Sequence, residues 1–429
     1  MAILQSPKGT RDFYPAEQAF RRYIHNAWER VSIRHGFEEV DGPVFETLDL
    51  YKVKSGDGIV SELFHFEDRG ERELALRPEF TPTLARMVAA KANALPRPVK
   101  WFTIPTLCRA EKPQRGRLRE FDQWNVDFLG SDSPMADAEV IFCAVDLLKE
   151  LGLTSDEVKV RLSHREAVRT ILSHLGVHAE SMDGAFNLLD AKSKMRDEDF
   201  KLKAAALGLS PEASERFAAL CAQPFAIGEE DALRTAAGIE TELPELKGLG
   251  AALKDFGLAG WCVYDLSIVR GLAYYTGTVF ELHVASGKER ALGGGGRYDK
   301  LVEMFGGPSV PAVGFGMGDV VLGNLLTDLK KLPERLAPAA DVFVLASSDL
   351  GATQLAPVVA QLRSAGLHAR MSYKTTRNVG KVLPDAQKCG AKFAVILGDE
   401  AGVAQVKTLV TGEQKSVDIL DLVRTIKGA

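Results

Sequence analysis

The chain has 429 residues and is 46% hydrophobic, which favours two or three domains because ordinary domains contain about 100 to 200 residues. Its formal net charge of -5 excludes a strongly basic nucleic-acid binder as a whole but leaves room for local basic patches. No apolar run reaches the ~20 residues that span a bilayer, and the N-terminus lacks a signal-peptide pattern, so we expect a cytoplasmic protein with no membrane partner.

The first third of the chain predicts helices and one long hairpin. Apolar spacing indicates an amphipathic helix over residues 18–35, and a second helix is expected over residues 81–95. Two strand-like runs, residues 99–110 and 117–130, then flank the polar, glycine-bearing segment EKPQRG. This order is typical of a hairpin with a long tip.

The middle of the chain alternates between helix and strand signals. Helices are expected over 134–152 and 165–176, and residues 178–245, rich in Ala, Leu and Glu, read as a helical insertion. Strand signals return at 260–267 and 276–285 and continue through ALGGGGRYD to AVGFGMGDVVL, a strand running into a helix. Hairpins mixed with helices favour an α+β domain over residues 1–330, built on a largely antiparallel sheet of six or more strands.

Charge and proline interrupt the pattern in residues 331–340, which we interpret as a linker. Beyond it, strand and helix signals alternate. This order predicts a compact α/β domain over residues 341–429, with at least some parallel pairing.

The five cysteines are odd in number and scattered, with no C-x-x-C pair that would indicate a zinc or redox site. We therefore predict reduced core thiols and no metal site built from protein ligands.

The hairpin carries the densest set of candidate functional side chains. A strand period of two puts them on one face of the sheet. They are Arg109, Glu111, Arg119, Phe121, Gln123 and Asp127. The alternative is a polar, solvent-facing side of a sheet with cross-strand ion pairs.

Two further segments carry candidates. In SIVRGLAYYTGTVFE, Arg270 stands in a run suited to burial and needs an anionic partner, which could equally be a structural carboxylate. Tyr274 and Tyr275 by themselves fit core packing. Four consecutive glycines precede Arg297 and Tyr298, giving either a permissive backbone for a ligand or a tight crossing of strands.

Taken together and in this order, the segments resemble the class II aminoacyl-tRNA synthetases, specifically the histidyl-tRNA synthetase family. The matching stretches are PKGTRDFYP, GFEEVDGPVFETLDLYKVKSG, FEDRGERELALRPE, RAEKPQRGRLREF, RGLAYYTGTVFE, GGGGRYDKLVEMFGG and AVGFGMG. The resemblance covers the whole chain and implies a histidine–tRNA ligase with an α+β catalytic domain and a C-terminal anticodon-binding domain. It also implies a homodimer formed through the Pro43 segment.

For ATP, the resemblance assigns Arg109 to the α-phosphate, Glu111 to the adenine amino group and Phe121 to stacking on the adenine ring. Arg119 would reach the terminal phosphates, where Mg²⁺ is expected to bind, and Gly316 belongs to the ATP-binding segment. Arg270 would sit beside the α-phosphate and stabilise the charge of the transition state.

For histidine, the resemblance assigns Glu79, Thr81 and Gln123 to the surroundings of the ammonium group. The imidazole pocket would contain Asp127, Arg270, Tyr274, Tyr275 and Tyr298. A carboxylate at one ring nitrogen and a hydroxyl at the other can form hydrogen bonds with both the donor and the acceptor nitrogen of the ring. Such a pocket rejects other side chains, because they leave its polar groups unpaired.

For tRNA, residues 178–245 would lie against the acceptor arm, and Gln114 and Arg115 in the hairpin tip would meet the acceptor end. Lys374 and Arg377 are candidates for anticodon contacts, and they fit ordinary surface charge equally well.

Three positions depart from the family pattern. Asp127 stands where many members have Glu, and Ala273 replaces the Asp of RGLDYY. The third departure is Val321, where most members have an arginine that packs over the adenine and reaches the γ-phosphate. Either another cation covers the nucleotide, with Arg115, Arg119 and Arg297 as candidates, or the chain is a non-catalytic regulatory subunit of ATP phosphoribosyltransferase. The intact hairpin residues and the C-terminal domain favour an active enzyme.

Overall fold

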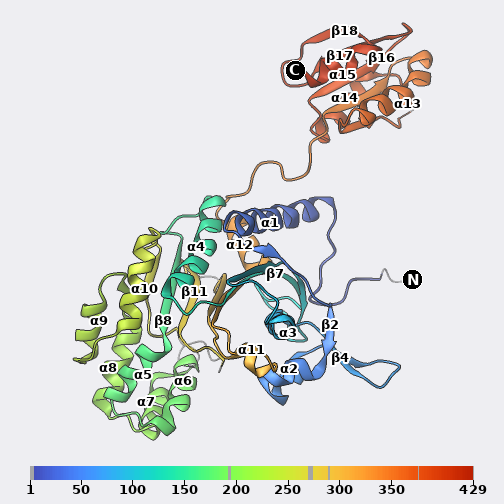
Figure 1. The fold of residues 1–429 in the computed structure, drawn as a ribbon. Helices are drawn as coiled ribbons and strands as arrows, with labels where there is room; N and C mark the ends of the chain where they lie inside the picture. Colours follow the sequence, from blue (N-terminus) through green and yellow to red (C-terminus); the bar gives the residue numbers. More distant parts are fainter. Residues whose placement is uncertain (1–3, 192–194, 269–273, 288–289, 375, 429) are drawn as a thin grey trace. The chain divides into compact units, whose positions relative to one another are not determined.

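The structure, a computed structural model, describes residues 4–191, 195–268, 274–287, 290–374 and 376–428. It contains two compact units, residues 1–334 and residues 335–429 (Figure 1). Among the described residues, no helix has both the length and the apolar character needed to cross a membrane.

The first unit is organised around a ten-stranded sheet with the order β1-β5-β7-β13-β12-β11-β8-β10-β9, and β6 also pairs with β7. Only the β1–β5 and β8–β10 pairs are parallel, which confirms the expected largely antiparallel sheet. The strands are β1 (Glu38–Glu39), β5 (Val99–Thr103), β6 (Thr106–Cys108), β7 (Glu120–Leu129), β8 (Val158–His164), β9 (Phe225–Ala226), β10 (Cys262–Tyr264), β11 (Thr278–Val284), β12 (Gly293–Arg297) and β13 (Ala312–Gly318).

Helices cover both faces of this sheet. Three of them, α1 (Pro15–Arg34), α4 (Pro134–Glu150) and α12 (Asp319–Asp328), share the larger core with one face. On the other face, α3 (Thr81–Lys91) and α11 (Leu301–Met304) pack over a smaller core (Figure 1). Beside α3 lie α2 (Leu48–Ser55) and a small sheet of β2 (Phe45–Thr47), β4 (Glu73–Leu76) and β3 (His65–Glu67).

The side chains of strand β7 alternate between the hydrophobic core and the opposite face of the sheet. Trp124 and Val126 are fully buried beneath α1 and α4, and Trp124 stacks on Trp28 with ring centroids 6.2 Å apart. Because successive side chains of a strand point to opposite faces, Gln123 and Asp127 must face the other way. The predicted shared face of the hairpin follows from this alternation.

Two details of the sheet differ from the sequence prediction. The expected single strand over 99–110 is interrupted between β5 and β6 at Ile104 and Pro105, since proline has no N–H to continue a ladder. Strand β8 was missed altogether, although its buried residues Val158, Val160 and Leu162 alternate with polar ones. This alternation is the ordinary signal of a half-buried strand.

Most of the segment predicted as a helical insertion is indeed helical. It is preceded by α5 (Arg165–His174) and contains α6 (Met182–Ala191), α7 (Asp197–Ala206), α8 (Pro211–Ala222), α9 (Glu230–Ala237) and α10 (Pro244–Asp255). The helices therefore continue past residue 245. Strand β9 interrupts them and pairs with β10 at the edge of the sheet. Two residues are too few to show a strand pattern, so the sequence did not predict this pairing.

The second unit has a five-stranded mixed sheet of order β15-β14-β16-β17-β18. The pairs of β14 are parallel and the others antiparallel. Its elements are β14 (Val342–Ala346), α13 (Asp349–Ser364), β15 (Ala369–Met371), α14 (Val379–Lys388), β16 (Phe393–Leu397), β17 (Val403–Thr408), β18 (Gln414–Asp418) and α15 (Leu422–Lys427). The predicted α/β order is confirmed as far as β16, whereas β17 and β18 were not predicted.

Arg297, at the end of β12, is fixed by two carboxylates, of which Asp137 is buried. Its Nη2 lies 2.5 Å from Oδ2 of Asp137 on α4, and its Nη1 lies 3.1 Å from Oδ1 of Asp299. The side chains of Arg297 and Asp137 are 8% and 2% exposed. This pair connects the sheet to α4 and commits the Arg297 guanidinium to a structural role.

We predict that Asp137→Ala lowers the free energy of unfolding by about 3 kcal/mol, because it leaves the Arg297 charge buried without its main partner. Urea denaturation measures the change. Glu215→Ala, which removes an exposed partner of Lys201, is the control and should change stability by less than about 0.5 kcal/mol. Equal effects of the two substitutions would contradict a structural role for the buried pair.

Candidate active site

Two adjacent cavities open on the face of the sheet that β7 shares with β12 and β13. The larger has a volume of ≈ 240 Å³ and the smaller ≈ 130 Å³. They share four lining residues, which are Arg109, Gln123, Gly294 and Gly316. The two cavities are therefore parts of one continuous site.

Arg109 lies at the junction of the two cavities. Its Nε donates a hydrogen bond to the Pro78 carbonyl oxygen at 3.0 Å, and its guanidinium lies 5.1 Å from the centre of the Phe121 ring. Within the described part of the chain, no carboxylate forms an ion pair with it. A positive charge is thus held in place and remains available to an anion that bridges the two cavities.

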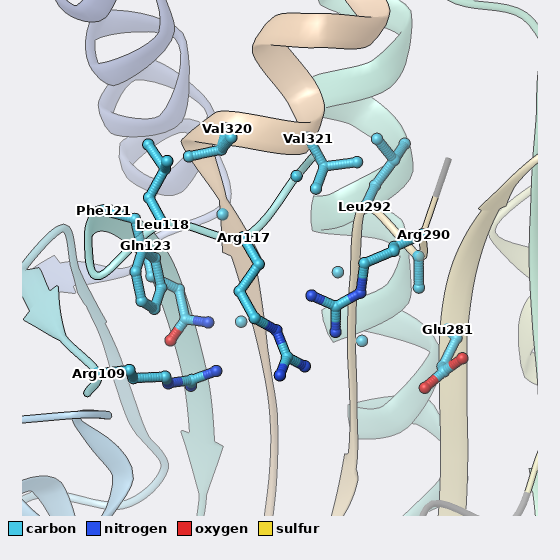
Figure 2. A pocket seen from close by; sticks show the side chains of 16 residues that line it. Arg109, Arg117, Leu118, Phe121, Gln123, Glu281, Arg290, Leu292, Val320 and Val321 are labelled. Atoms are coloured by element: carbon cyan, nitrogen blue, oxygen red, sulfur yellow. The ribbon is translucent and has the colours of Figure 1, made fainter. Parts of the chain in front are cut away.

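The larger cavity is lined by cations and small residues (Figure 2). Figure 2 shows the guanidiniums of Arg109, Arg117 and Arg290 around the same space, with Val320 and Val321 on the opposite wall. Sequence reasoning missed Arg117 and Arg290. Arg117 stands two residues before Arg119 in the quoted motif, whereas nothing in the sequence pattern marks Arg290.

Glu111 and Arg117 form an ion pair across the hairpin tip, with Nη1 and Oε1 2.6 Å apart. The other carboxylate oxygen of Glu111, Oε2, is buried and has no hydrogen-bond partner among the described residues. Because leaving a buried acceptor unpaired is costly, a ligand with an N–H group is the natural partner for this oxygen.

Arg119 does not line either cavity. Its Nε contacts the Glu111 carbonyl oxygen at 3.3 Å, and its Nη1 contacts the Lys8 carbonyl oxygen at 3.5 Å. The side chain therefore holds the N-terminal segment against the hairpin. The structure brings Arg117, not Arg119, into the larger cavity.

Asp127 and Tyr298 form the floor of the smaller cavity. The Tyr298 hydroxyl donates a hydrogen bond to Oδ1 of Asp127. Burial raises the pKa of Asp127 to about 7, a rise that the Tyr298 hydrogen bond and the charge of Lys54 partly offset. Burial and the neighbouring carboxylate also raise the pKa of Tyr298, so its hydroxyl stays protonated.

The walls of the smaller cavity include Glu79, Thr81, Tyr274 and Tyr275. Glu79 forms an ion pair with Lys54, whose ammonium lies 4.3 Å from the centre of the Tyr274 ring. The Lys54 side chain is 2% exposed. Lys54 was not singled out from the sequence, although it lies in the quoted segment that ends in KVKSG. Its positive charge pairs with Glu79 and acts to lower the pKa of Asp127.

Glycine is required where β12 and β13 pass beneath the site. A Cβ at Gly316 would lie 2.9 Å from the Gln123 amide, and one at Gly314 would overlap the Asp127 carboxylate. The glycines therefore keep the site floor open for the polar side chains of β7.

Helix α12 begins directly after β13 and is fixed by Asp319. This buried carboxylate forms an ion pair with Arg11 at 2.7 Å and accepts a hydrogen bond from the Asp122 backbone N–H at 3.0 Å. These contacts place Val320 and Val321 against the larger cavity, where they offer apolar surface and no charge.

The remaining predicted residues lie at other places. Gln114 and Arg115 are exposed at the hairpin tip, where Arg115 lies 3.1 Å from Asp328 on α12. Pro43 is exposed beside β2. Arg270 and Ala273 lie outside the described residues.

Comparisons with known proteins identify relatives of both units. A family model described as histidyl-tRNA synthetase matches residues 9–318, and a model described as anticodon binding domain matches residues 341–429. A curated histidine–tRNA ligase from Opitutus terrae is 40% identical over 97% of this chain and 96% of its own length.

Solved structures share the fold. A histidyl-tRNA synthetase from Nostoc sp. PCC 7120 superposes with a TM-score of 0.80 at 24% identity, over the whole of both chains. A Bacillus halodurans structure titled ATP phosphoribosyltransferase regulatory subunit/histidyl-tRNA synthetase gives 0.74 at 23% identity, over 94% of this chain and 100% of that one. At these identities the structures establish the fold alone.

The raised pKa of Asp127 predicts a pH-dependent stability. Since the folded pKa of about 7 exceeds the unfolded value, the buried carboxyl stabilises the fold most at low pH and loses that contribution as pH rises from about 4 to 7. Relative to Asp127→Asn, the wild type should lose about 1.4 kcal/mol per pH unit across this range.

Urea denaturation at several pH values measures this difference. Asp418→Asn, on the exposed strand β18, serves as the control and should give no comparable pH dependence. A constant stability difference between wild type and Asp127→Asn from pH 4 to 7 would refute the assignment.

Proposed function

The chain belongs to the histidyl-tRNA synthetase family, and we propose that the two joined cavities of its first unit are the place where histidine is activated. The chain is a histidine–tRNA ligase, whose substrates are histidine, ATP and tRNA. Histidine and ATP first give histidyl-adenylate and pyrophosphate, and the histidyl group then passes to the 3′ end of the tRNA. The observation that carries the proposal is the position of Arg109, at the junction of a small cavity and a larger one.

In this proposal, the smaller cavity holds histidine. Asp127 and Tyr298 face the imidazole ring, and Glu79, Thr81 and Gln123 surround the ammonium group. The Asp127–Tyr298 hydrogen bond fixes both groups before the substrate arrives. Tyr274 and Tyr275, with ring centroids 4.5 Å apart, close the side of the pocket. A side chain without ring nitrogens would leave the Asp127 carboxyl without its partner, which disfavours its binding.

The larger cavity holds the nucleotide. Phe121 lines this cavity and offers its ring to the adenine. Glu111 does not line the cavity itself but pairs with Arg117, which does, and we assign its unpaired Oε2 to the adenine amino group. Gly316 lets the nucleotide approach the backbone of β13 closely. We assign the terminal phosphates to Arg117 in place of Arg119, because Arg117 lines this cavity and Arg119 does not.

Arg109 binds the α-phosphate, which lies between the two substrates when the histidine carboxylate attacks phosphorus. Its guanidinium is fixed by the Pro78 carbonyl and needs little reorganisation during the reaction. The family role of Arg270 is to add positive charge at the same phosphate. Both arginines act by electrostatic stabilisation and not by proton transfer.

Mg²⁺ is proposed to accompany the β- and γ-phosphates. Its ligands would be mostly phosphate oxygens and water, because hard cations prefer oxygen ligands. Glu281 is the carboxylate that lines the larger cavity and could provide one protein ligand. The bound ion would neutralise phosphate charge.

The tRNA contacts are proposed at three places. The helices within residues 178–245 would lie against the acceptor arm, and the exposed hairpin tip with Gln114 and Arg115 would meet the acceptor end. The predicted domain over residues 341–429, which lies within the second unit, would read the anticodon. Lys374 and Arg377 remain candidates there, although both already contact carboxylates, Asp385 at 2.7 Å and Asp349 at 2.6 Å.

A homodimer is proposed through the segment that contains Pro43. Its neighbours Val44 and Phe45 are 56% and 50% exposed, and Phe66 on the adjacent β3 is 45% exposed. Phe45 and Phe66 contact each other edge to face, with centroids 6.3 Å apart. A contiguous exposed apolar patch of this kind is typical of a protein interface.

The cytoplasm is the proposed compartment, because all five cysteines are free. Cys143, Cys221 and Cys262 are buried, as expected for core thiols, while Cys108 and Cys389 are partly exposed. No observation favours the regulatory-subunit alternative, since its fold is shared with the ligases.

The activity is tested by histidine-dependent exchange of pyrophosphate into ATP, without tRNA. We predict exchange by the wild type and a loss of at least about 100-fold in kcat/KM in Arg109→Ala and in Arg270→Ala, because in this proposal each removes a positive charge that stabilises the reacting phosphate. Arg30→Ala, an exposed arginine on α1, is the control and should stay within about twofold. A well-folded wild type without exchange would refute adenylate formation.

The proposed interface predicts a dimer in sedimentation equilibrium. Phe45→Glu should give a monomer, since a charge cannot be buried in an apolar interface without a partner. Leu202→Glu, which changes an even more exposed apolar residue on α7, should leave the dimer intact. A monomeric wild type, or a dimeric Phe45→Glu variant, would contradict the proposed interface.

A further inference from the structure

The proposed nucleotide cavity has Val321 where the resemblance to the synthetase family implies an arginine. The first turn of α12 presents Val320 and Val321 to the cavity, and Val321 is 7% exposed. Apolar side chains can cover a base, but they cannot offset the charge of a triphosphate. If ATP binds here, another residue must supply that charge.

The three cations that the sequence offered for this role are committed elsewhere. Arg297 is buried in its ion pair with Asp137. Arg119 contacts backbone oxygens and does not line the cavity. Arg115 lies on the exposed hairpin tip, where it forms an ion pair with Asp328.

Arg290, which stands three residues before β12, does line the cavity. Figure 2 shows its guanidinium directed into the space between Arg117 and the wall that carries Val321. Within the described residues, it forms no hydrogen bond and no ion pair. It also enters from the strand side of the cavity, whereas the missing family arginine would have entered from α12.

The charges around Arg290 favour an anion. Burial lowers the pKa of Arg290, as do the positive charges of Arg117 and Arg109, while Glu111 and Glu281 act in the opposite direction. Glu111 is already paired with Arg117, and Glu281 lies 2.9 Å from His283. The cavity therefore brings together guanidiniums that repel one another until a negatively charged ligand enters.

We infer that Arg290 supplies to the ATP phosphates the positive charge that the family arginine at the position of Val321 supplies elsewhere. The two roles of that arginine are divided in this chain. Val320 and Val321 provide apolar cover for the nucleotide, and Arg290 provides the charge from the opposite wall. The inference rests on the proposed nucleotide site.

Substitution of Arg290 tests the inference in the pyrophosphate exchange assay. Arg290→Ala should raise the KM for ATP by about tenfold or more, as expected for a lost charge-assisted contact, and change the KM for histidine by less than about twofold. Arg290→Lys should fall between wild type and Arg290→Ala, because it keeps the charge without the planar fork. Arg72→Ala, an exposed arginine paired with Asp68, is the matched control and should behave as wild type.

The double variant Arg290→Ala/Val321→Arg provides the specific test. Placing an arginine on α12 should recover most of the lost ATP affinity, which a merely structural role of Arg290 would not allow. Arg290→Met, which keeps the aliphatic part of the side chain, separates loss of charge from loss of packing and should match Arg290→Ala. Urea denaturation should show the wild-type stability for the single variants of Arg290, and it checks that the double variant is folded before its KM is compared.

The outcomes distinguish the inference from the function it rests on. An unchanged KM for ATP in Arg290→Ala, or loss of ATP and histidine affinity together, would overturn the role of Arg290 while leaving the site assignment intact. Absence of exchange in the wild type would instead overturn the site assignment.

Discussion

The alternation of side chains along β7 is the constraint on which the rest of the structure depends. One set of its residues, represented by Trp124 and Val126, completes the core beneath α1 and α4. The other set must then face the opposite side, where it places Phe121, Gln123 and Asp127 in line along one site. A shift of one residue in the pairing of β7 would bury the polar set and expose the tryptophan, so the stability of the core and the geometry of the site are fixed together.

The charged side chains of the first unit fall into two groups, those that hold the fold together and those that line the site. Structural ions are matched with buried partners, as in the Arg297–Asp137 pair and the Arg21–Asp122 contact at 2.5 Å. Ions of the site are only partly matched: Arg109 has a carbonyl oxygen for a partner, and Arg290 has none among the described residues. Water or a bound ligand must therefore provide the missing partners of Arg109 and Arg290. Because these charges are positive and held on a rigid sheet, the site favours a polyanion.

Much of this arrangement could be predicted from sequence, because it follows from local patterns. The period of two in the hairpin placed Gln123 and Asp127 on one face, and the alternating elements predicted the α/β second unit. The sequence could not show that Arg117 and not Arg119 enters the cavity, since the hairpin tip departs from regular strand geometry at Gly116. Lys54 and Arg290 were missed for a different reason. Each reaches the site through tertiary contacts between segments far apart in the chain, and neither stands in a recognisable spacing.

The central claim is that one face of the sheet holds both substrates, with Arg109 between them. A crystal structure with a non-hydrolysable histidyl-adenylate analogue tests it most directly. We predict the imidazole beside Asp127 and Tyr298, the adenine against Phe121 and the phosphate mimic within hydrogen-bonding distance of Arg109. An analogue bound with its purine in the smaller cavity, or away from β7 altogether, would contradict the account.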